Sequence, residues 1–445
     1  MFLLERNRFV STTASSTTRH IRPARALNGS LRLPGDKSIS HRYAMLAALA
    51  EGTTRLSNFS TGADPHSTLG CMERLGARVT HTPAGVIEVT GCAGTLRQPT
   101  EPLDCGNSGS TMRMLAGILA AQPLHCTLIG DESLSRRPME RIRKPLALMG
   151  AQIDLTDGHA PMQVHGGSLQ GVDFSTPIAS AQVKSCLLFA GLRATGTTTV
   201  HEPVRTRDHG ELALRAFGAE LTRTTGSVTI RGGQSLHAID ATVPGDLSSA
   251  AFFLCAAAIF PGSQLLLDGV GMNPTRATLL DVLRTLGLSI SMLQLEEKHG
   301  ELVGALQVSG PANGLSGATI SGALSAQLID ELPVLAAIAP YTRDGIQIRD
   351  ARELRVKESD RIALVAKNLR AMGASVTEHE DGLDVPGNQA LHGAVIDSGG
   401  DHRIAMAFSV AGLRANGDTE IHGAESAAIS FPEFFDLLER ITERQ

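Results

Sequence analysis

Three polar side chains follow a Pro-Gly turn near the start of the chain, in the stretch LPGDKSISHR. They are Lys37, Ser38 and Arg42, and they lead directly into the apolar run YAMLAALAEG. Ser38 and Arg42 are four residues apart, so they share one face of the expected helix. A helix start presents free backbone N–H groups and the positive end of the helix dipole. These residues therefore predict a phosphate or carboxylate site, with a capped helix bearing solvated charges as the simpler alternative.

Other polar residues of the first half also lie at the starts of expected helices. Gly109 stands in DCGNSGSTMR, where the missing side chain lets a ligand approach the backbone closely. Arg137 precedes a proline in SRRPM, and Ser180 and Gln182 open the helix of PIASAQVKS. Arg207 lies in VRTRDHGE. Taken singly, each of these residues could belong to an ordinary helix start or to a solvated surface.

The second half adds carboxylates to the same pattern. IDELP places Asp330 before an apolar helix, RVKESDR brings Lys357, Glu358 and Arg361 together, and GGDHRIAMAF contributes Arg403. Asp330 could be a helix cap, and Glu358 could form a surface ion pair with Arg361 at i,i+3. Taken together, the pattern predicts a cleft for two anionic small molecules, with cations from both halves. The acid–base groups, Asp330 and Glu358, come from the second half alone.

Two sequence patterns recur about every 70 residues and indicate how these side chains are positioned. A large apolar residue and a glycine end a helix before a strand in LGARV, MGAQI, FGAEL, LGLSI and MGASV. Six Ala- and Leu-rich helices follow polar turns and are apolar nearly all round, so we expect them to be buried. We therefore predict six copies of one α+β unit, arranged as two domains of three units in an α/β (α+β) fold.

Similar Pro-Gly-Asp turns at residues 34–36 and 244–246 begin the two groups of three units. If the chain crosses between domains at these turns, residues 28–36 and 247–445 form one domain, and residues 37–246 form the other. We then expect the ligand site in the cleft between the two domains.

Composition excludes several kinds of protein. The net charge of −5 excludes a generally basic surface, so no non-specific nucleic-acid binder is indicated, and the longest apolar run, residues 250–260, is too short to span a membrane. The six cysteines form no C-x-x-C pair. We therefore expect reduced thiols in a cytoplasmic protein without a structural metal site.

The first 27 residues differ from the rest, with five arginines, one glutamate and many Ser and Thr residues. Organelle transit peptides have such a composition. A disordered bacterial extension is the alternative that we adopt, so residues 1–27 are left out of the expected fold.

Eight motifs, in order from about residue 28, carry a resemblance to a known family. They are PGDKSISHR, GNSGSTMR, SRRPM, ASAQVKS, TRDH, IDELPVLA, LRVKESDR and GGDHRIAMAFSV. Through them the chain resembles 5-enolpyruvylshikimate-3-phosphate synthase, and ASAQVKS and TRDH are closer to the second bacterial class than to the enterobacterial and plant forms. The resemblance implies two domains, each of three βαβαββ units, in an inside-out barrel-like fold.

The resemblance also implies a reaction. The enolpyruvyl group of phosphoenolpyruvate moves to the 5-hydroxyl of shikimate 3-phosphate and phosphate leaves, in the step before chorismate in aromatic amino-acid biosynthesis. It implies a monomer that uses these two small molecules and no cofactor or metal. The family is the target of the phosphonate herbicide glyphosate, which occupies the phosphoenolpyruvate subsite.

Residues at matching positions inherit roles from the resemblance. Those expected to bind shikimate 3-phosphate are Lys37, Ser38, Arg42, Ser180, Gln182, Arg207, Asp330 and Lys357. Those expected to bind phosphoenolpyruvate are Lys37, Gly109, Arg137, Gln182, Arg361 and Arg403. Three residues are expected to be catalytic. Asp330 takes the proton of the 5-hydroxyl, Glu358 shuttles a proton to the methylene carbon, and Lys37 contacts both substrates.

The chain departs from the better-known members at two places. Ile429 and Ser430 stand in AAISFPEF, where those members carry a lysine, so one phosphoenolpyruvate contact is in doubt. Ala181 replaces a second serine, so one phosphate contact is expected from the backbone or from Lys184.

Two other functions remain as alternatives. An enolpyruvyl transferase acting on UDP-N-acetylglucosamine would be expected to have a Lys-Asn pair at the first helix and a loop cysteine. Here Ser38 follows the lysine, and SLSRRPM has no cysteine. A non-catalytic module that binds phosphorylated metabolites would not need carboxylates such as Asp330 and Glu358 facing anions.

Overall fold

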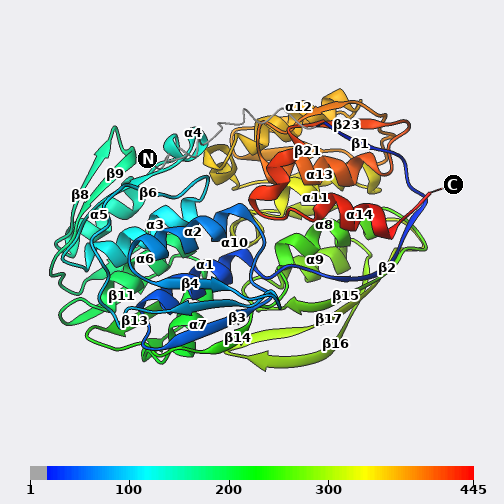
Figure 1. The fold of residues 1–445 in the computed structure, drawn as a ribbon. Coiled ribbons are helices and arrows are strands. Elements are labelled where there is room, and N and C mark those ends of the chain that lie inside the picture. Colours follow the sequence, from blue (N-terminus) through cyan, green and yellow to red (C-terminus); the bar gives the residue numbers. More distant parts are fainter. Residues whose placement is uncertain (1–17, 445) are drawn as a thin grey trace, which may run out of the picture.

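A computed structural model describes residues 18–444, and Figure 1 shows its two halves side by side. The first unit of one half contains α1 (Lys37–Leu49), β3 (Thr53–Ser57), α2 (Ala63–Arg74), β4 (Arg78–His81) and β5 (Ile87–Thr90). The second contains β6 (Leu103–Asp104), α3 (Gly109–Ala120), β7 (His125–Ile129), α4 (Glu132–Ser135), α5 (Glu140–Leu148), β8 (Gln152–Thr156) and β9 (His159–His165). The third contains β10 (Asp173–Ser175), α6 (Ala181–Gly191), β11 (Thr197–His201), α7 (His209–Ala216), β12 (Leu221–Arg223) and β13 (Ser227–Arg231).

The other half follows the same plan. Its first unit contains α8 (Leu247–Ala258), β15 (Gln264–Gly271), α9 (Thr278–Thr285), β16 (Ser289–Lys298) and β17 (Glu301–Ser309). Its second contains β18 (Ala318–Ile320), α10 (Ala323–Gln327), α11 (Leu332–Ile338), β19 (Ile346–Ile348), α12 (Arg361–Ala371), β20 (Thr377–His379) and β21 (Gly382–Val385), with 3₁₀ turns at Ala339–Tyr341 and Arg352–Val356. Its third contains β22 (Val395–Asp397), α13 (His402–Gly412), β23 (Thr419–His422), a 3₁₀ turn at Ala424–Ile429, and α14 (Phe434–Ile441).

One strand order recurs in these units. In the sheet β6-β7-β9-β8, the first two strands are parallel and the remaining neighbours are antiparallel, and β10-β11-β13-β12 and β18-β19-β21-β20 repeat this order. Strands such as β9 alternate buried and exposed residues, so one face of each sheet meets solvent. Every residue of α8 is buried, as the apolar pattern predicts. Helices therefore fill the interior, and the predicted α/β repeat is confirmed.

The chain crosses between the halves at two adjacent points. Strand β2 (Ala26–Arg32) precedes α1 but pairs with β15 of the other half, and β14 (Asp240–Thr242) precedes α8 but pairs with β3. Between the crossings, Asp36 N donates to Pro244 O at 2.7 Å and Asp246 N to Pro34 O at 3.0 Å. A Cβ at Gly35 would lie 1.9 Å from Asn58 O, so only glycine allows this approach.

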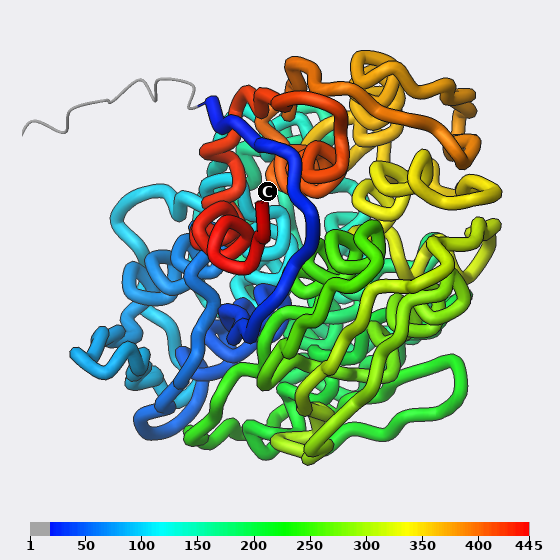
Figure 2. Tube along the Cα trace, turned by 90° about the vertical axis from the view of Figure 1, so that its right-hand side faces the viewer, coloured from blue at the N-terminus to red at the C-terminus, as the bar shows by residue number. Residues whose placement is uncertain are grey.

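Two separate apolar clusters lie on either side of the crossings. One takes its residues from 39–243 and the other from 21–33 and 247–441. Figure 2 shows β2, in blue, running between the green strands of the second cluster and the red C-terminal helix. On the side away from β15, strand β2 pairs antiparallel with β24 (Thr442–Glu443).

The exclusion of residues 1–27 from the fold is wrong for its last ten residues. Strand β1 (Arg19–Ile21) pairs antiparallel with β23, and Ile21 is buried in the second cluster. The sixth unit has no strand pair after β23, because its chain continues into a 3₁₀ turn and α14, so β1 takes the vacant place beside β23. Residues 1–17, which hold the remainder of the expected extension, lie outside the described residues.

Candidate active site

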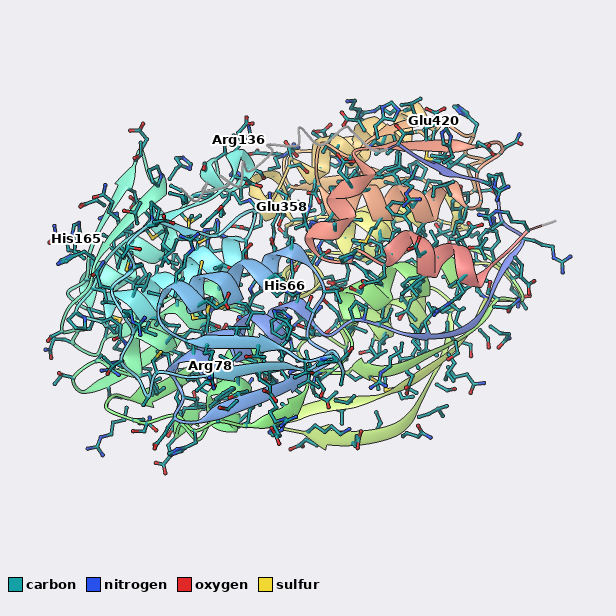
Figure 3. All side chains as sticks on the ribbon, viewed as in Figure 1. His66, Arg78, Arg136, His165, Glu358 and Glu420 are labelled. Atoms are coloured by element: carbon teal, nitrogen blue, oxygen red, sulfur yellow. The ribbon has the colours of Figure 1, made fainter. Side chains whose placement is uncertain are left out.

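A cavity of about 280 Å³ lies between the two halves and is lined by side chains from both. Twelve of the thirteen residues selected from the sequence line it: Lys37, Ser38, Arg42, Gly109, Arg137, Ser180, Gln182, Arg207, Asp330, Lys357, Glu358 and Arg403. Arg361, the thirteenth, is 1% exposed and lies directly behind the wall. Figure 3 places Glu358 between the halves and Arg136 at the outer surface, where Arg136 pairs with Glu132. The structure therefore separates the two arginines of SRRPM, since Arg137 alone faces the cavity.

Lys37 and Arg42 occupy the first turns of α1. Lys37 Nζ lies 3.2 Å from a carboxylate oxygen of Asp64, which is 5% exposed at its side chain. Arg42 donates through Nη2 to Ser185 Oγ at 2.9 Å and through Nη1 to Ser38 O at 2.8 Å. Burial lowers the pKa of Arg42 to about 10, and nearby Glu211 opposes that change. Arg42 thus remains a cation at neutral pH with its side chain fixed in place.

The backbone at the start of α1 differs from the expected anion site. Asp36 Oδ1 accepts from Ile39 N at 2.9 Å, and Asp246 Oδ2 accepts from Lys37 N at 3.2 Å. Aspartates therefore already occupy two of the amides that the sequence analysis offered to a ligand. An anion at this helix start must be held chiefly by the side chains of Lys37, Ser38 and Arg42.

A buried arginine links the starts of α3 and α6. Arg113 Nη1 donates to Gln182 Oε1 at 2.8 Å, and Gln182 Nε2 donates to Ser110 Oγ at 3.0 Å. Burial, followed by the charges of neighbouring Arg141 and Arg137, lowers the pKa of Arg113 to about 9. A Cβ built on Gly109 would lie 2.8 Å from Arg113 Nη1. Sequence reasoning missed Arg113, although it ends the motif GNSGSTMR on the helix face four residues after Gly109.

Lys184 cannot supply the phosphate contact expected from the second serine of better-known members, in whose place this chain has Ala181. Its ammonium group is fully buried and lies 2.8 Å from carboxylates of both Glu202 and Glu211, and it does not line the cavity. That expectation is wrong, because two buried carboxylates hold the lysine in the core of its own domain. Ser180 caps α6 by accepting from Val183 N at 3.3 Å, which leaves the amides of the first turn as the other expected source.

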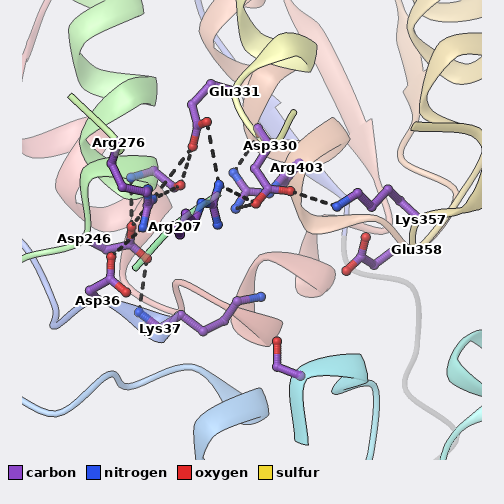
Figure 4. Close-up of polar contacts among 12 residues, drawn as sticks. Asp36, Lys37, Arg207, Asp246, Arg276, Asp330, Glu331, Lys357, Glu358 and Arg403 are labelled. Atoms are coloured by element: carbon purple, nitrogen blue, oxygen red, sulfur yellow. Dashed lines mark hydrogen bonds and ion pairs between the residues drawn. The ribbon is translucent and has the colours of Figure 1, made fainter. Parts of the chain in front are cut away.

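Asp330 lies among four cations at the turn before α11 (Figure 4). Its carboxylate oxygens are 2.7 Å from Arg207, 3.4 Å from Lys357, 3.6 Å from Arg361 and 3.9 Å from Arg403. Burial raises its pKa, but these cations together outweigh burial and hold the pKa well below the usual range. Asp330 is therefore ionised and can accept a proton. Arg207 reaches it from the opposite half.

Glu358 has a similar environment and shares Arg361 with Asp330. Its oxygens lie 2.7 Å from Arg361 and 3.5 Å from Arg137 of the opposite half. Burial opposes ionisation, yet Arg361, Arg137 and more distant cations hold its pKa well below the usual range. Arg361 also binds Asp401 at 2.8 Å, so the ion pair with Glu358 is a buried contact rather than the exposed pair of the alternative interpretation.

A carboxylate of the first half, that of Asp64, also faces the cavity. Asp64 lies on α2, and burial raises its pKa while Lys37 lowers it to a smaller extent. The sequence analysis placed acid–base groups in the second half alone and so missed Asp64, which no motif marks. Ile429 and Ser430 do not line the cavity. Their backbone lies against Gly62, where an added Cβ would be 2.8 Å from both residues.

Two further properties concern the described residues as a whole. Among residues 18–444, no group of three or more His, Cys, Asp and Glu side chains is placed to hold a metal ion. In the same range, no helix has the length and apolar character needed to cross a membrane.

The chain shares its fold and most of its length with proteins of one family. The family description that matches residues 21–438 is EPSP synthase (3-phosphoshikimate 1-carboxyvinyltransferase). A relative of that enzyme name from Koribacter versatilis is 64% identical over 95% of this chain and 99% of its own length. One from Solibacter usitatus is 55% identical over 96% of this chain and 100% of its own. An EPSP synthase structure from Acinetobacter baumannii matches with a TM-score of 0.84 at 40% identity, covering 96% of this chain and 98% of that one.

The fold is that of a two-domain α/β protein, and cations and carboxylates of both halves line its cleft. With these matches, the chain belongs to the EPSP synthase family. The resemblance inferred from eight motifs is confirmed.

Proposed function

We propose how the residues of the cleft share the work of the family reaction. The enzyme is a transferase that moves the enolpyruvyl group of phosphoenolpyruvate to the 5-hydroxyl of shikimate 3-phosphate and releases phosphate. The overall change forms a C–O bond to C2 of phosphoenolpyruvate and breaks the C2–O bond to phosphate. A proton leaves the hydroxyl, and another must visit and then leave the methylene carbon. Two carboxylates among cations supply what these steps need.

Binding of both anions falls to cations and hydroxyls of the two walls. Ser38, Arg42, Ser180, Arg207 and Lys357 hold shikimate 3-phosphate in this proposal, while Arg137, Arg361 and Arg403 hold phosphoenolpyruvate beside Gly109. Lys37 and Gln182 contact both ligands in this proposal. The support is that these side chains, except Arg361, line one cavity of about 280 Å³.

Asp330 and Glu358 divide the proton transfers. Asp330, ionised beside Lys357 and Arg207, accepts the hydroxyl proton. Glu358 starts as a carboxylate because Arg361 and Arg137 hold its pKa low. The phosphate and carboxylate of phosphoenolpyruvate engage the same arginines and offset their charge, so ligand binding raises the pKa of Glu358. Glu358 then takes up a proton from water, gives it to the methylene carbon, and takes one back from that carbon after phosphate leaves.

Several broader expectations remain proposals. We propose that residues 28–36 with 247–445 form one domain, to which the pairing of β1 and the burial of Ile21 add residues 18–27, and that residues 37–246 form the other; the two apolar clusters support this division. We place the chain in the second bacterial class of the family. We also propose a cytoplasmic monomer without a nucleic-acid partner, supported by its net charge of −5.

The single observation that carries these roles is the meeting of Asp330 and Glu358 with cations of the opposite half. Phosphate release from phosphoenolpyruvate tests the function directly. We expect release that requires shikimate 3-phosphate and forms one enolpyruvyl product per phosphate. Release that requires UDP-N-acetylglucosamine instead would assign the other transferase activity. No release with either acceptor, despite binding of shikimate 3-phosphate, would leave a binding module.

A further inference from the structure

One buried guanidinium ties together the two places where the chain crosses between the halves. Arg276 is 5% exposed and precedes α9. Its Nη1 donates to Asp36 Oδ2 at 2.8 Å, and its Nη2 donates to Asp246 Oδ1 at 3.3 Å. Asp36 caps α1 and Asp246 caps α8, so Arg276 holds the first residues of both helices (Figure 4).

Through these aspartates Arg276 reaches Lys37. Asp246 accepts from Lys37 N at 3.2 Å, and Asp36 accepts from Ile39 N at 2.9 Å. The backbone of the first turn of α1 is thus fixed by carboxylates that Arg276 itself orients. A displacement of Arg276 would therefore shift the backbone of Lys37 and, with it, the position of its side chain.

In the other direction Arg276 reaches Asp330. It donates to Ser248 Oγ, whose hydroxyl donates to Glu331, and a Glu331 oxygen lies 3.9 Å from Arg276 itself. Glu331 is 4% exposed, does not line the cavity and directly follows Asp330 in the chain. Arg207 Nη2 also lies 4.0 Å from an oxygen of Glu331 and 2.7 Å from an oxygen of Asp330.

The charges make this arrangement depend on an arginine. Asp36, Asp246 and Glu331 are all at least 90% buried, and Arg276 contacts all three. Burial disfavours the guanidinium cation, but Asp36, Asp246 and Glu331 raise its pKa, so it stays charged. A lysine would supply one compact ammonium group in place of the planar guanidinium. It could not contact all three carboxylates with the same geometry at once.

We propose that Arg276 is a positioning residue that fixes the spacing between Lys37 on one wall and Asp330 on the other. The inference rests on the catalytic roles proposed for Lys37 and Asp330. It adds that their relative placement depends on a side chain that neither reacts nor titrates. Misplacement of reacting groups by about 1 Å can cost roughly 100-fold in rate, so loss of this link lowers kcat more than it raises either KM.

The test compares Arg276→Lys and Glu331→Gln with the unchanged enzyme. Glu331→Gln keeps the shape of the side chain and removes its charge toward Arg276. We expect kcat to fall about 10- to 100-fold in Arg276→Lys and less in Glu331→Gln, with both KM values nearly unchanged. Ser263→Ala is the control, because Ser263 Oγ accepts from Leu27 N at 2.9 Å in the same domain and does not line the cavity. It should lower thermal stability without changing kcat.

Each other result overturns the inference. A kcat of Arg276→Lys within twofold of the unchanged enzyme, with only thermal stability lowered, would give Arg276 a purely structural role. A raised KM for one substrate at unchanged kcat would make it a binding residue. If Arg276→Lys does not fold, an unchanged kcat in Glu331→Gln is sufficient to reject the link. Asp330→Asn is measured beside them: normal turnover in that variant rejects the role of Asp330 whatever Arg276 does.

Discussion

At the scale of single residues, the cleft is defined by how charges compensate each other across the two walls. Arg207 of one half pairs with Asp330 of the other at 2.7 Å, and Arg137 pairs with Glu358 at 3.5 Å. Two cations chosen from the sequence as ligands for anions are thus paired with the carboxylates proposed for catalysis. In the proposed roles, substrate anions compete for the same arginines, which links binding to proton transfer through shared charges.

Gly109 gives a prediction at this scale. An alanine there would place Cβ 2.8 Å from Arg113 Nη1 and 3.4 Å from Arg137 Nη1, which would narrow the subsite proposed for phosphoenolpyruvate. Glyphosate is slightly longer than phosphoenolpyruvate, so we expect Gly109→Ala to raise the glyphosate inhibition constant about 10- to 200-fold, with a smaller rise in the KM for phosphoenolpyruvate. Steady-state inhibition of both forms measures this. An equal loss for inhibitor and substrate would mean that Gly109 does not line the subsite as proposed.

The residues that sequence reasoning missed share one property. Arg113, Asp64 and Arg276 line the cavity, but each acquires its role from partners far away in the chain. Arg113 meets Gln182 across 69 residues, and Arg276 meets Asp36 across 240. Site residues at helix starts could be predicted because each lies in a short motif with characteristic local spacing. Long-range pairs of single side chains leave no local pattern.

At the scale of elements, buried helices place each functional turn. Because α8 and α13 are buried throughout, their N-terminal turns can vary little in position. Their apolar-all-round sequences predicted this burial, and the repeated Pro-Gly-Asp turns indicated where the chain crosses. Strand β1 was not predicted, because three residues without alternation gain their place only from pairing with β23 at the other end of the chain.

We predict that strand β1 contributes to the stability of the fold. Ile21→Ala removes a side chain buried against the second apolar cluster and should cost about 2–5 kcal/mol of stability. His20→Ala is the matched control, since His20 is 61% exposed and its loss should cost less than about 0.5 kcal/mol. Urea unfolding of both variants measures the difference. Equal small effects would show that β1 does not contribute to the fold.

At the scale of the whole molecule, the free energy of unfolding at acid pH depends on histidines and carboxylates that are buried in their unprotonated forms. Burial, and then nearby Lys37, hold the pKa of both His41 and His402 well below 6.5. The unfolded chain binds these protons first, so the stabilising effect of the neutral rings is complete above pH 6.5 and declines as pH falls below it. Asp330 and Glu358 also have lowered pKa values, and their contribution is lost only at more acid pH, below their ordinary values of 3.8 and 4.5.

We therefore predict a fall in unfolding free energy in two stages. The first lies below pH 6.5, with a slope of up to about 1.4 kcal/mol per pH unit for each histidine, and the second lies below about pH 4. Urea midpoints between pH 8 and pH 3.5 would show both stages, and His41→Gln should flatten the first one. A midpoint that rises on acidification from pH 7 to pH 5 would contradict the assignment of neutral buried histidines.

We propose that Asp330 and Glu358 perform the proton transfers while cations of both walls bind the substrates. Single-turnover measurements with Asp330→Asn and Glu358→Gln test it most directly, because they separate chemistry from binding. We predict that each change lowers the rate of product formation about 100-fold or more, while shikimate 3-phosphate and phosphoenolpyruvate still bind. Product formation at nearly the unchanged rate in both variants would contradict the claim.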